Sequence, residues 1–208
     1  MKKMVALAMA ATMALSLTAC GSSEKPAETA APATEAAAPA EGPSEAAPAE
    51  STESKKALEG KKVGFAQTDS MSAWRTTETD SIKEYVENAG GEFIVKDAGG
   101  DIATQESDIR DLVAAGVDYL VVAPLENNGL QGALQEAMES NIPVILVDRA
   151  IDGEAGTHYT TAIMSDFIWE GEQCAKALTE ALPDGGNVVI INGGYDSSTS
   201  TDRQDGFV

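Results

Sequence analysis

The chain has 208 residues and a formal net charge of −20, from 34 acidic and 14 basic side chains. This length fits one large domain or about one and a half ordinary domains, and the acidic excess opposes binding to DNA or RNA phosphates. Two cysteines and one histidine are too few for a disulfide framework, a cysteine-built zinc site or a three-histidine metal centre. No dinucleotide-binding or P-loop motif is present either, so we expect no nucleotide cofactor. Together with the charge and the cysteine and histidine counts, this predicts no nucleic acid partner, no metal and no cofactor.

Residues 1–20 have the layout of a bacterial export signal. Two lysines precede an apolar run over residues 4–17, which is shorter than the roughly 20 residues of a membrane-spanning helix. The run ends in Leu-Thr-Ala-Cys, followed by Gly-Ser-Ser. This pattern resembles the lipobox of bacterial lipoproteins, and the resemblance implies that Cys20 is lipidated and becomes the mature N-terminus. An ordinary secretory signal with a chance cysteine is the alternative.

The next segment, residues 21–57, is predicted to be a disordered tether. Residues 21–54 hold 11 Ala, 7 Glu, 5 Pro and 8 Ser or Thr, and they include no Leu, Ile, Val or aromatic residue. Such a composition offers no apolar surface to offset the entropic cost of ordering the chain. A flexible coil of this length spans roughly 30 Å.

From residue 58 onward, short apolar runs alternate with segments of helical periodicity. Near-continuous apolar strands of four or five residues are typical of a parallel sheet that helices cover on both faces. The predicted fold class is therefore α/β with a doubly wound parallel sheet, in which ligands bind beyond the carboxyl ends of the strands. We expect strands over residues 63–66, 92–96, 119–123, 144–147, 159–163 and 188–191, and helices over about 82–89, 104–115, 130–138 and 166–182.

Two segments that follow predicted strands carry the side chains expected to bind a ligand. Trp74 and Arg75 lie at a loop-to-helix junction after the first strand, and Asp148 and Arg149 follow the fourth. An indole face can stack on a sugar ring, and a carboxylate beside a guanidinium suits neighbouring hydroxyls, which both donate and accept hydrogen bonds. The alternatives are a tryptophan that packs on the domain and a structural ion pair at the strand end.

A third candidate follows the sixth predicted strand. Residues 192–201 form a Gly-, Ser- and Thr-rich loop, and Arg203 comes just after it, in the first turn of an expected helix. A helix start already presents backbone donors, so an arginine there makes a donor-rich corner. The alternative is a flexible polar loop with an arginine that faces solvent.

Other function classes find less support in the sequence. A glycosidase would need paired carboxylates in the cleft; Glu78 and Asp148 are candidates, but Arg149 favours the charged form of Asp148, which is unsuited to a general acid. No Ser/His/Asp arrangement surrounds His158, which we expect at the surface or at a strand edge. Cys174 lies on the apolar stripe of its helix, which predicts a core residue rather than a nucleophile. We therefore expect no catalytic residues and no enzyme.

The segment from residue 62 to 208 resembles the periplasmic sugar-binding proteins of ribose-binding type, the type I solute-binding proteins of ABC importers. The stretches VGFAQTDSMSAWRTTETDSIK, VAPLENNG, IPVILVDRAID and STSTDRQDGF are most similar to galactofuranose-binding members of this family. The chain departs from the family at Phe167, where asparagine is usual. The resemblance implies that the following residues contact the sugar: Trp74, Arg75, Glu78, Asp148, Arg149, Asp166 and Arg203.

The resemblance also implies a domain organisation and a function. Residues 58–164 are expected to form an N-terminal lobe that lacks its returning strands, and residues 165–208 the start of a truncated C-terminal lobe. The implied protein is a monomer, anchored by lipid outside the cytoplasm, that closes on a galactofuranose-like hexose or pentose and delivers it to an ABC permease. A sugar sensor that presents its ligand to a membrane receptor is the alternative. A sugar-responsive repressor would instead need an N-terminal helix-turn-helix and no export signal.

Overall fold

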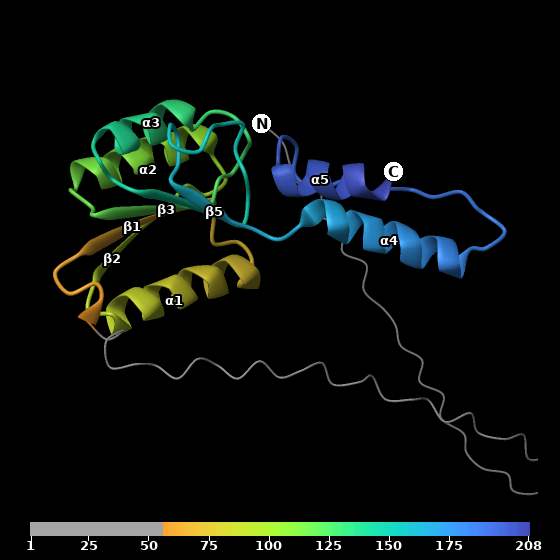
Figure 1. The fold of residues 1–208 in the computed structure, drawn as a ribbon, viewed down its shortest axis with the longest axis horizontal. Coiled ribbons are helices and arrows are strands. Elements are labelled where there is room, and N and C mark those ends of the chain that lie inside the picture. The colour runs from red at the N-terminus through yellow and green to blue at the C-terminus, as the bar shows by residue number, and fades with distance from the viewer. Residues whose placement is uncertain (1–55) are drawn as a thin grey trace, which may run out of the picture. The chain divides into compact units, whose positions relative to one another are not determined.

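A five-stranded parallel sheet dominates the computed structural model, which describes residues 56–208 (Figure 1). The strands follow the order β2-β1-β3-β4-β5, and every neighbouring pair is parallel. The strands are β1 (Lys62–Gln67), β2 (Glu92–Asp97), β3 (Tyr119–Val122), β4 (Val144–Val147) and β5 (Thr161–Ile163). The helices are α1 (Ala73–Asn88), α2 (Ile102–Ala114), α3 (Gln131–Glu139), α4 (Phe167–Ala181) and α5 (Ser198–Phe207). The predicted α/β class is confirmed.

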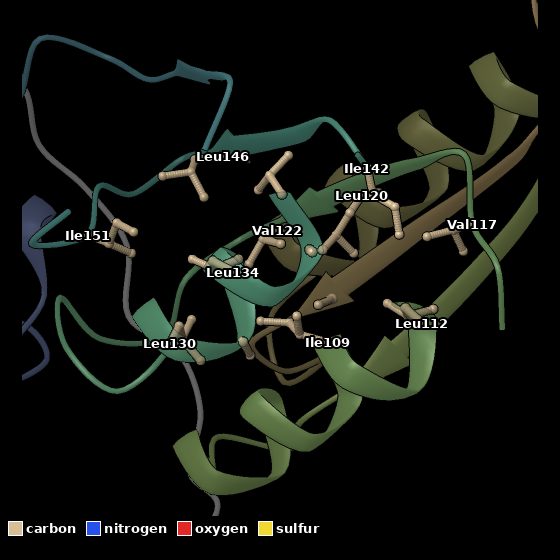
Figure 2. Close-up of a cluster of buried hydrophobic side chains, with 14 residues drawn as sticks. Ile109, Leu112, Val117, Leu120, Val122, Leu130, Leu134, Ile142, Leu146 and Ile151 are labelled. Carbon is tan, nitrogen blue, oxygen red and sulfur yellow. The ribbon is translucent and has the colours of Figure 1, made fainter. Parts of the chain in front are cut away.

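Helices cover both faces of the sheet, with α2 and α3 on one face and α1 on the other (Figure 1). Beneath α2 and α3 lies the larger apolar cluster, in which Ile109, Leu120 and Leu134 are fully buried (Figure 2). The α1 face is built around Phe65 and Val121. Strands buried on both sides have apolar residues at successive positions, which is why the sequence shows runs rather than alternation.

Side-chain caps determine where two of these helices begin. The Ser72 hydroxyl accepts a hydrogen bond from the Arg75 backbone N–H at the start of α1. The Asp101 carboxylate accepts one from Thr104 at the start of α2, at 2.7 Å. Such caps satisfy backbone donors that have no partner inside the helix. The cap at Ser72 places the first turn of α1, with Arg75, at the carboxyl end of β1.

Helices α4 and α5 follow the sheet in sequence and pack against each other at two glycines. A Cβ atom added at Gly206 would overlap the Ile168 carbonyl, and one added at Gly171 would overlap the Arg203 carbonyl. The two backbones therefore approach closely only because neither position carries a side chain.

Three predictions for this last segment are wrong. Helix α5 begins at Ser198, inside the predicted loop, so Arg203 lies in its second turn rather than its first. Residues 188–191 form no strand, and Val189 and Ile191 are 86% and 93% exposed. An extended apolar segment becomes a strand only beside a hydrogen-bonded neighbour, and no described residue pairs with it. Cys174 is exposed rather than part of the core; it lies one helical turn after Gly171 and lines the hollow beside α5 with it.

Predictions for the N-terminus lie largely outside the described residues. This applies to the export signal over residues 1–20, to lipidation at Cys20 and to the tether up to residue 55. Residues 56 and 57, which the prediction included in the tether, lie in a turn, where the Lys56 carbonyl accepts a hydrogen bond from Glu59 at 3.2 Å. Over residues 56–208, no helix has the length and apolar character needed to cross a membrane.

Candidate functional site

The carboxyl ends of β1 and β4 bring together side chains that are far apart in the sequence. Gln67 ends β1, and α1 starts six residues later at Ala73; Asp148 directly follows β4. In a parallel sheet these ends lie at one edge. As a result, Arg75 and Asp148 meet across 73 positions of sequence, with 2.6 Å between Nη2 and Oδ2.

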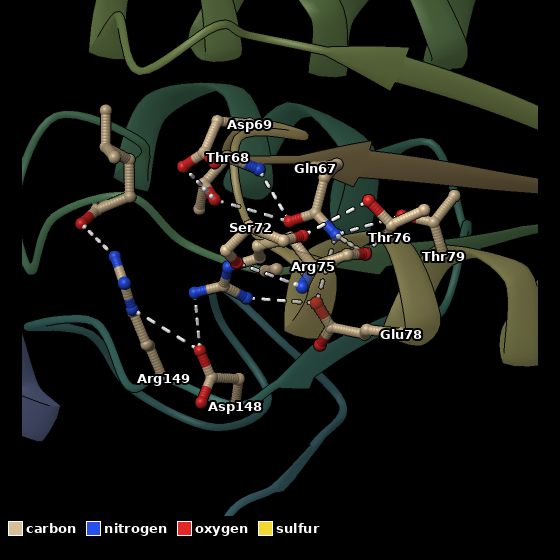
Figure 3. A network of polar contacts seen from close by, with 12 residues as sticks. Gln67, Thr68, Asp69, Ser72, Arg75, Thr76, Glu78, Thr79, Asp148 and Arg149 are labelled. Atoms are coloured by element: carbon tan, nitrogen blue, oxygen red, sulfur yellow. Dashed lines mark hydrogen bonds and ion pairs between the residues drawn. The ribbon is translucent and has the colours of Figure 1, made fainter. Parts of the chain in front are cut away.

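Arg75 is the centre of a buried charge cluster and is only 5% exposed. Its Nη1 donates to Glu78 Oε2 at 2.9 Å, and its Nη2 donates to Asp148 Oδ2 (Figure 3). Glu78 lies three positions further along α1, a spacing that places both side chains on the same helix face. A buried guanidinium needs such partners, because an unpaired buried charge is strongly unfavourable.

Asp148 adopts a left-handed backbone conformation, with φ of 65°. Its backbone N–H donates to the Ile163 carbonyl of β5 at 3.0 Å, which holds the turn after β4 in place. Few L-residues adopt this conformation easily, but aspartate is among those that tolerate it. Such outliers concentrate at functional sites, where the surrounding structure maintains them.

Arg149 donates from Nη1 to the Leu125 carbonyl at 2.9 Å. Its Nε lies 3.4 Å from Asp148 Oδ2 but forms no hydrogen bond to any described residue. Desolvation by burial, followed by the positive charge of Arg75, lowers the pKa of Arg149. An arginine remains charged at neutral pH nonetheless, so this buried Nε–H is a hydrogen-bond donor without a partner among the described residues.

Trp74 stands beside this cluster with 56% of its surface exposed. The Arg75 Cζ lies 4.8 Å from the centroid of its ring, a cation–π distance. Trp74, Glu78 and Asp148 line one open hollow of about 820 Å³, together with Ile163 and Met164. Three of the predicted ligand-binding residues therefore share one hollow, and Arg75 lies buried beside them.

A second hollow, of about 490 Å³, contains two other predicted residues, Arg149 and Arg203. The Arg203 Nε donates to Glu170 at 2.8 Å, and its Cζ lies 4.5 Å from the centroid of the Phe167 ring. Asn192 lines the same hollow. The predicted group is thus divided, because Arg149 lies in a different hollow from Trp74.

Asp166 lines neither of these hollows. It is the N-cap of α4, and its Oδ1 accepts a hydrogen bond from the Trp169 backbone N–H at 2.9 Å. The contact shown for this carboxylate is therefore a helix cap, while its predicted contact with a sugar stays a prediction.

Two buried glutamines that support the site were missed by sequence reasoning. Gln67 bonds to residues of α1, and Gln105 donates to the Ala123 carbonyl at 2.7 Å and accepts from the Leu125 N–H at 2.9 Å. Gln105 thereby fixes the loop whose carbonyl holds Arg149. A signal was present, because Gln105 occupies the inward face of α2 four residues before Ile109. A polar residue at such a position needs buried partners.

The chemistry of the first hollow suits a neutral polyhydroxyl compound. Carboxylate oxygens accept hydrogen bonds from hydroxyls, and an exposed indole offers an apolar face. Among residues 56–208, no cluster of three or more His, Cys, Asp or Glu side chains could hold a metal ion.

The fold and this site define a periplasmic-binding-protein domain. The family described as "Periplasmic binding protein domain" matches residues 63–208, and the chain belongs to that family.

Among its relatives is the galactofuranose-binding protein YtfQ of Escherichia coli (strain K12), which is 35% identical over 146 residues, covering 70% of this chain and 46% of YtfQ. The ribose import binding protein RbsB of Bacillus subtilis (strain 168) is 30% identical over 126 residues, covering 61% of this chain and 40% of RbsB. A crystal structure of a galactofuranose binding protein has a TM-score of 0.67 at 34% identity, covering 71% of this chain and 50% of that one. The chain thus spans about half the length of the curated relatives it matches.

Proposed function

We propose that the protein carrying this sequence binds a monosaccharide outside the cytoplasm and delivers it to an ABC importer permease. The observation that carries the proposal is one hollow in which the exposed Trp74 ring lies beside the carboxylates of Glu78 and Asp148. A polyol is bound well by an apolar face on which its ring can stack and by groups that accept hydrogen bonds from its hydroxyls.

The class of sugar is inferred from the hollow together with the names of the relatives. Solved neighbours include a galactofuranose binding protein, an arabinose transporter component from Shewanella sp. ANA-3 bound to arabinofuranose, and a Mycobacterium smegmatis protein in complex with fucofuranose. Their sequence identity to this chain is 34%, 31% and 35%. A galactofuranose-like hexose or a related pentose is therefore the proposed ligand.

Capture is proposed to occur by closure of two lobes. Residues 58–164 provide the first lobe, with Trp74 and the cluster around Arg75, and residues 165–208 begin the second, with Arg203. A sugar that contacts both lobes binds the closed form better than the open one and so shifts the equilibrium toward closure. Arg149, which lines the second hollow, is proposed to contact the sugar as well.

Calorimetric titration of the full-length protein with pentoses and hexoses in both ring forms tests the ligand. Trp74→Ala should weaken binding of the preferred sugar by more than about 1 kcal/mol, the usual worth of an aromatic stacking contact. Trp169→Ala is the matched control, because Trp169 is equally exposed, at 56%, but lines neither hollow. Unchanged affinity in Trp74→Ala, or equal losses in both variants, would reject the stacking role.

Anchoring is proposed to occur through lipid on Cys20, which would keep the binding protein close to its permease. One acyl chain holds a protein only marginally, whereas several chains anchor it firmly. Metabolic labelling with a palmitate analogue should mark the parent protein and not Cys20→Ser. Equal labelling of the two would remove the lipoprotein assignment and leave the sugar site unaffected.

A further inference from the structure

We propose that Gln67 is a positioning residue for the sugar site, and that it orients the Arg75 guanidinium through the carboxylate of Glu78. The effect on sugar affinity rests on the proposed function, but the effect on Arg75 does not. Gln67 itself is 2% exposed and lines neither the Trp74 hollow nor the Arg203 hollow.

Every polar atom of the Gln67 carboxamide is engaged. Its Nε2 donates to Glu78 Oε2 at 3.0 Å and to Thr79 Oγ1 at 3.1 Å. Its Oε1 accepts a hydrogen bond from the Thr68 backbone N–H at 2.8 Å. The Thr68 contact fixes the plane of the amide relative to the end of β1, so the direction of its Nε2–H bonds is fixed as well.

Gln67 Nε2 also lies 3.5 Å from the Arg75 backbone carbonyl, but its link to the Arg75 guanidinium passes through a single oxygen atom. Glu78 Oε2 accepts from both Gln67 Nε2 and Arg75 Nη1, at 3.0 and 2.9 Å (Figure 3). The other end of the guanidinium is held by Asp148 Oδ2. Gln67, Glu78, Arg75 and Asp148 therefore form one continuous chain of hydrogen bonds, and such chains are strengthened by mutual polarisation in a low-dielectric interior.

The chemistry of an amide fits this role better than that of a charged donor. A lysine or arginine at position 67 would compete with Arg75 for the negative charge of Glu78, whereas a neutral amide fixes the carboxylate and leaves its charge to Arg75. Both bonds go to Oε2 of Glu78. The second oxygen is then left for a ligand hydroxyl in the hollow that Glu78 lines.

The first experiment uses no ligand. In protein labelled with ¹⁵N-arginine, the Nη–H groups of Arg75 should give resolved, slowly exchanging signals, assigned by their loss in Arg75→Lys. Gln67→Met should merge or broaden these signals. Gln135→Met is the control, because Gln135 also donates from its amide to a carboxylate, that of Glu139 at 2.8 Å, but lies on α3, and it should leave them unchanged. Unchanged Arg75 signals in Gln67→Met would overturn the proposal.

Two measurements cover the case in which Gln67→Met does not fold. Gln67→Asn keeps the carboxamide but shortens it by one methylene, so it should lose the Glu78 contact and alter the Arg75 signals in the same way. In protein with Gln67 intact, Glu78→Gln should shift the Gln67 side-chain amide resonances. Absence of that shift would refute the link through Glu78.

The second experiment measures sugar affinity in a double-mutant cycle. Gln67→Met should weaken binding about tenfold or more, since tenfold corresponds to about 1.4 kcal/mol, close to the lower end for a hydrogen bond to a charged group. In a Glu78→Gln background the further loss from Gln67→Met should be much smaller. Additive losses would overturn the proposed path. If the parent protein binds no sugar, the proposed function fails, while the arginine spectra still decide the role of Gln67.

Discussion

Replacing the central cation of the site should destabilise the protein strongly. Arg75→Met keeps the length of the side chain and much of its apolar stem, so little cavity is created. It removes the two charge-assisted hydrogen bonds of 2.9 and 2.6 Å and leaves two carboxylates without their shared cation. Removing one partner of a buried ion pair costs about 3–5 kcal/mol. Because the Glu78 and Asp148 side chains keep 12% and 15% exposure, water can partly solvate them, and we expect a loss of about 3 kcal/mol.

Urea denaturation of the purified protein, followed by circular dichroism, measures this loss as a change in the free energy of unfolding. Arg110→Met is the control, because Arg110 also bonds to two carboxylates, those of Glu106 and Glu136, but its side chain is 42% exposed. Surface pairs contribute little, so this variant should lose only a small fraction of what Arg75→Met loses. Equal losses in the two variants, or a loss below about 1 kcal/mol at Arg75, would refute the claim that burial makes this cluster important.

Two further predictions concern other carboxylates. The pKa of Asp118 is lowered, mainly by a side-chain hydrogen bond from Lys61. The ionised carboxylate therefore stabilises the folded state at pH values above its unfolded pKa of about 3.9. This stabilisation is lost as the pH falls through the lower folded pKa. The stability difference between the parent and Asp118→Asn should therefore vanish in acid, and a difference that persists in urea titrations at low pH would contradict this. Asp166→Ala should lower the free energy of unfolding by about 1 kcal/mol, because the N-cap of α4 is lost. Asp166→Ser keeps a capping side chain, so it should retain the stability of the parent but bind sugar weakly. Equal stability losses in the two variants would argue against the cap.

The fold was predictable because its signals are local and repeated. The run Val63–Ala66 shows no polar alternation, and in the structure it is buried on both faces. The first helix was recognised only from its apolar face, at Ile82, Val86 and neighbouring positions. It begins at Ala73, nine residues before Ile82. This start was missed because the first turns carry mostly polar side chains, which leave no periodic apolar signal. The one local signal there was Ser72, the N-cap residue.

Two of the errors have one physical origin, which is that a sequence pattern specifies a face for burial but not its partner. Residues 188–191 have the composition of a strand, and Cys174 has the position of a core residue. Neither finds a covering element among the described residues, so both are exposed in the structure. Hydrophobic patterning is evidence about what a segment can bury, and the contact itself depends on what lies opposite.

The site shows a similar division between what the sequence carries and what it does not. The rule that ligands bind at the carboxyl ends of strands was enough to select Trp74, Arg75 and Asp148. It could not show that Arg75 is buried and bonded to two carboxylates, because its bond to Asp148 joins residues 73 positions apart in the sequence. Nor did it select Gln67, whose importance lies only in the atoms to which it bonds.

Two adjacent residues at the end of β4 serve different hollows. In an extended strand, successive side chains point to opposite faces, but the left-handed φ of 65° at Asp148 changes that geometry at the end of β4. Its carboxylate reaches Arg75 and the Trp74 hollow, while Arg149 reaches Leu125 and the hollow of Arg203. A single ligand that spans both hollows would therefore contact both members of the pair.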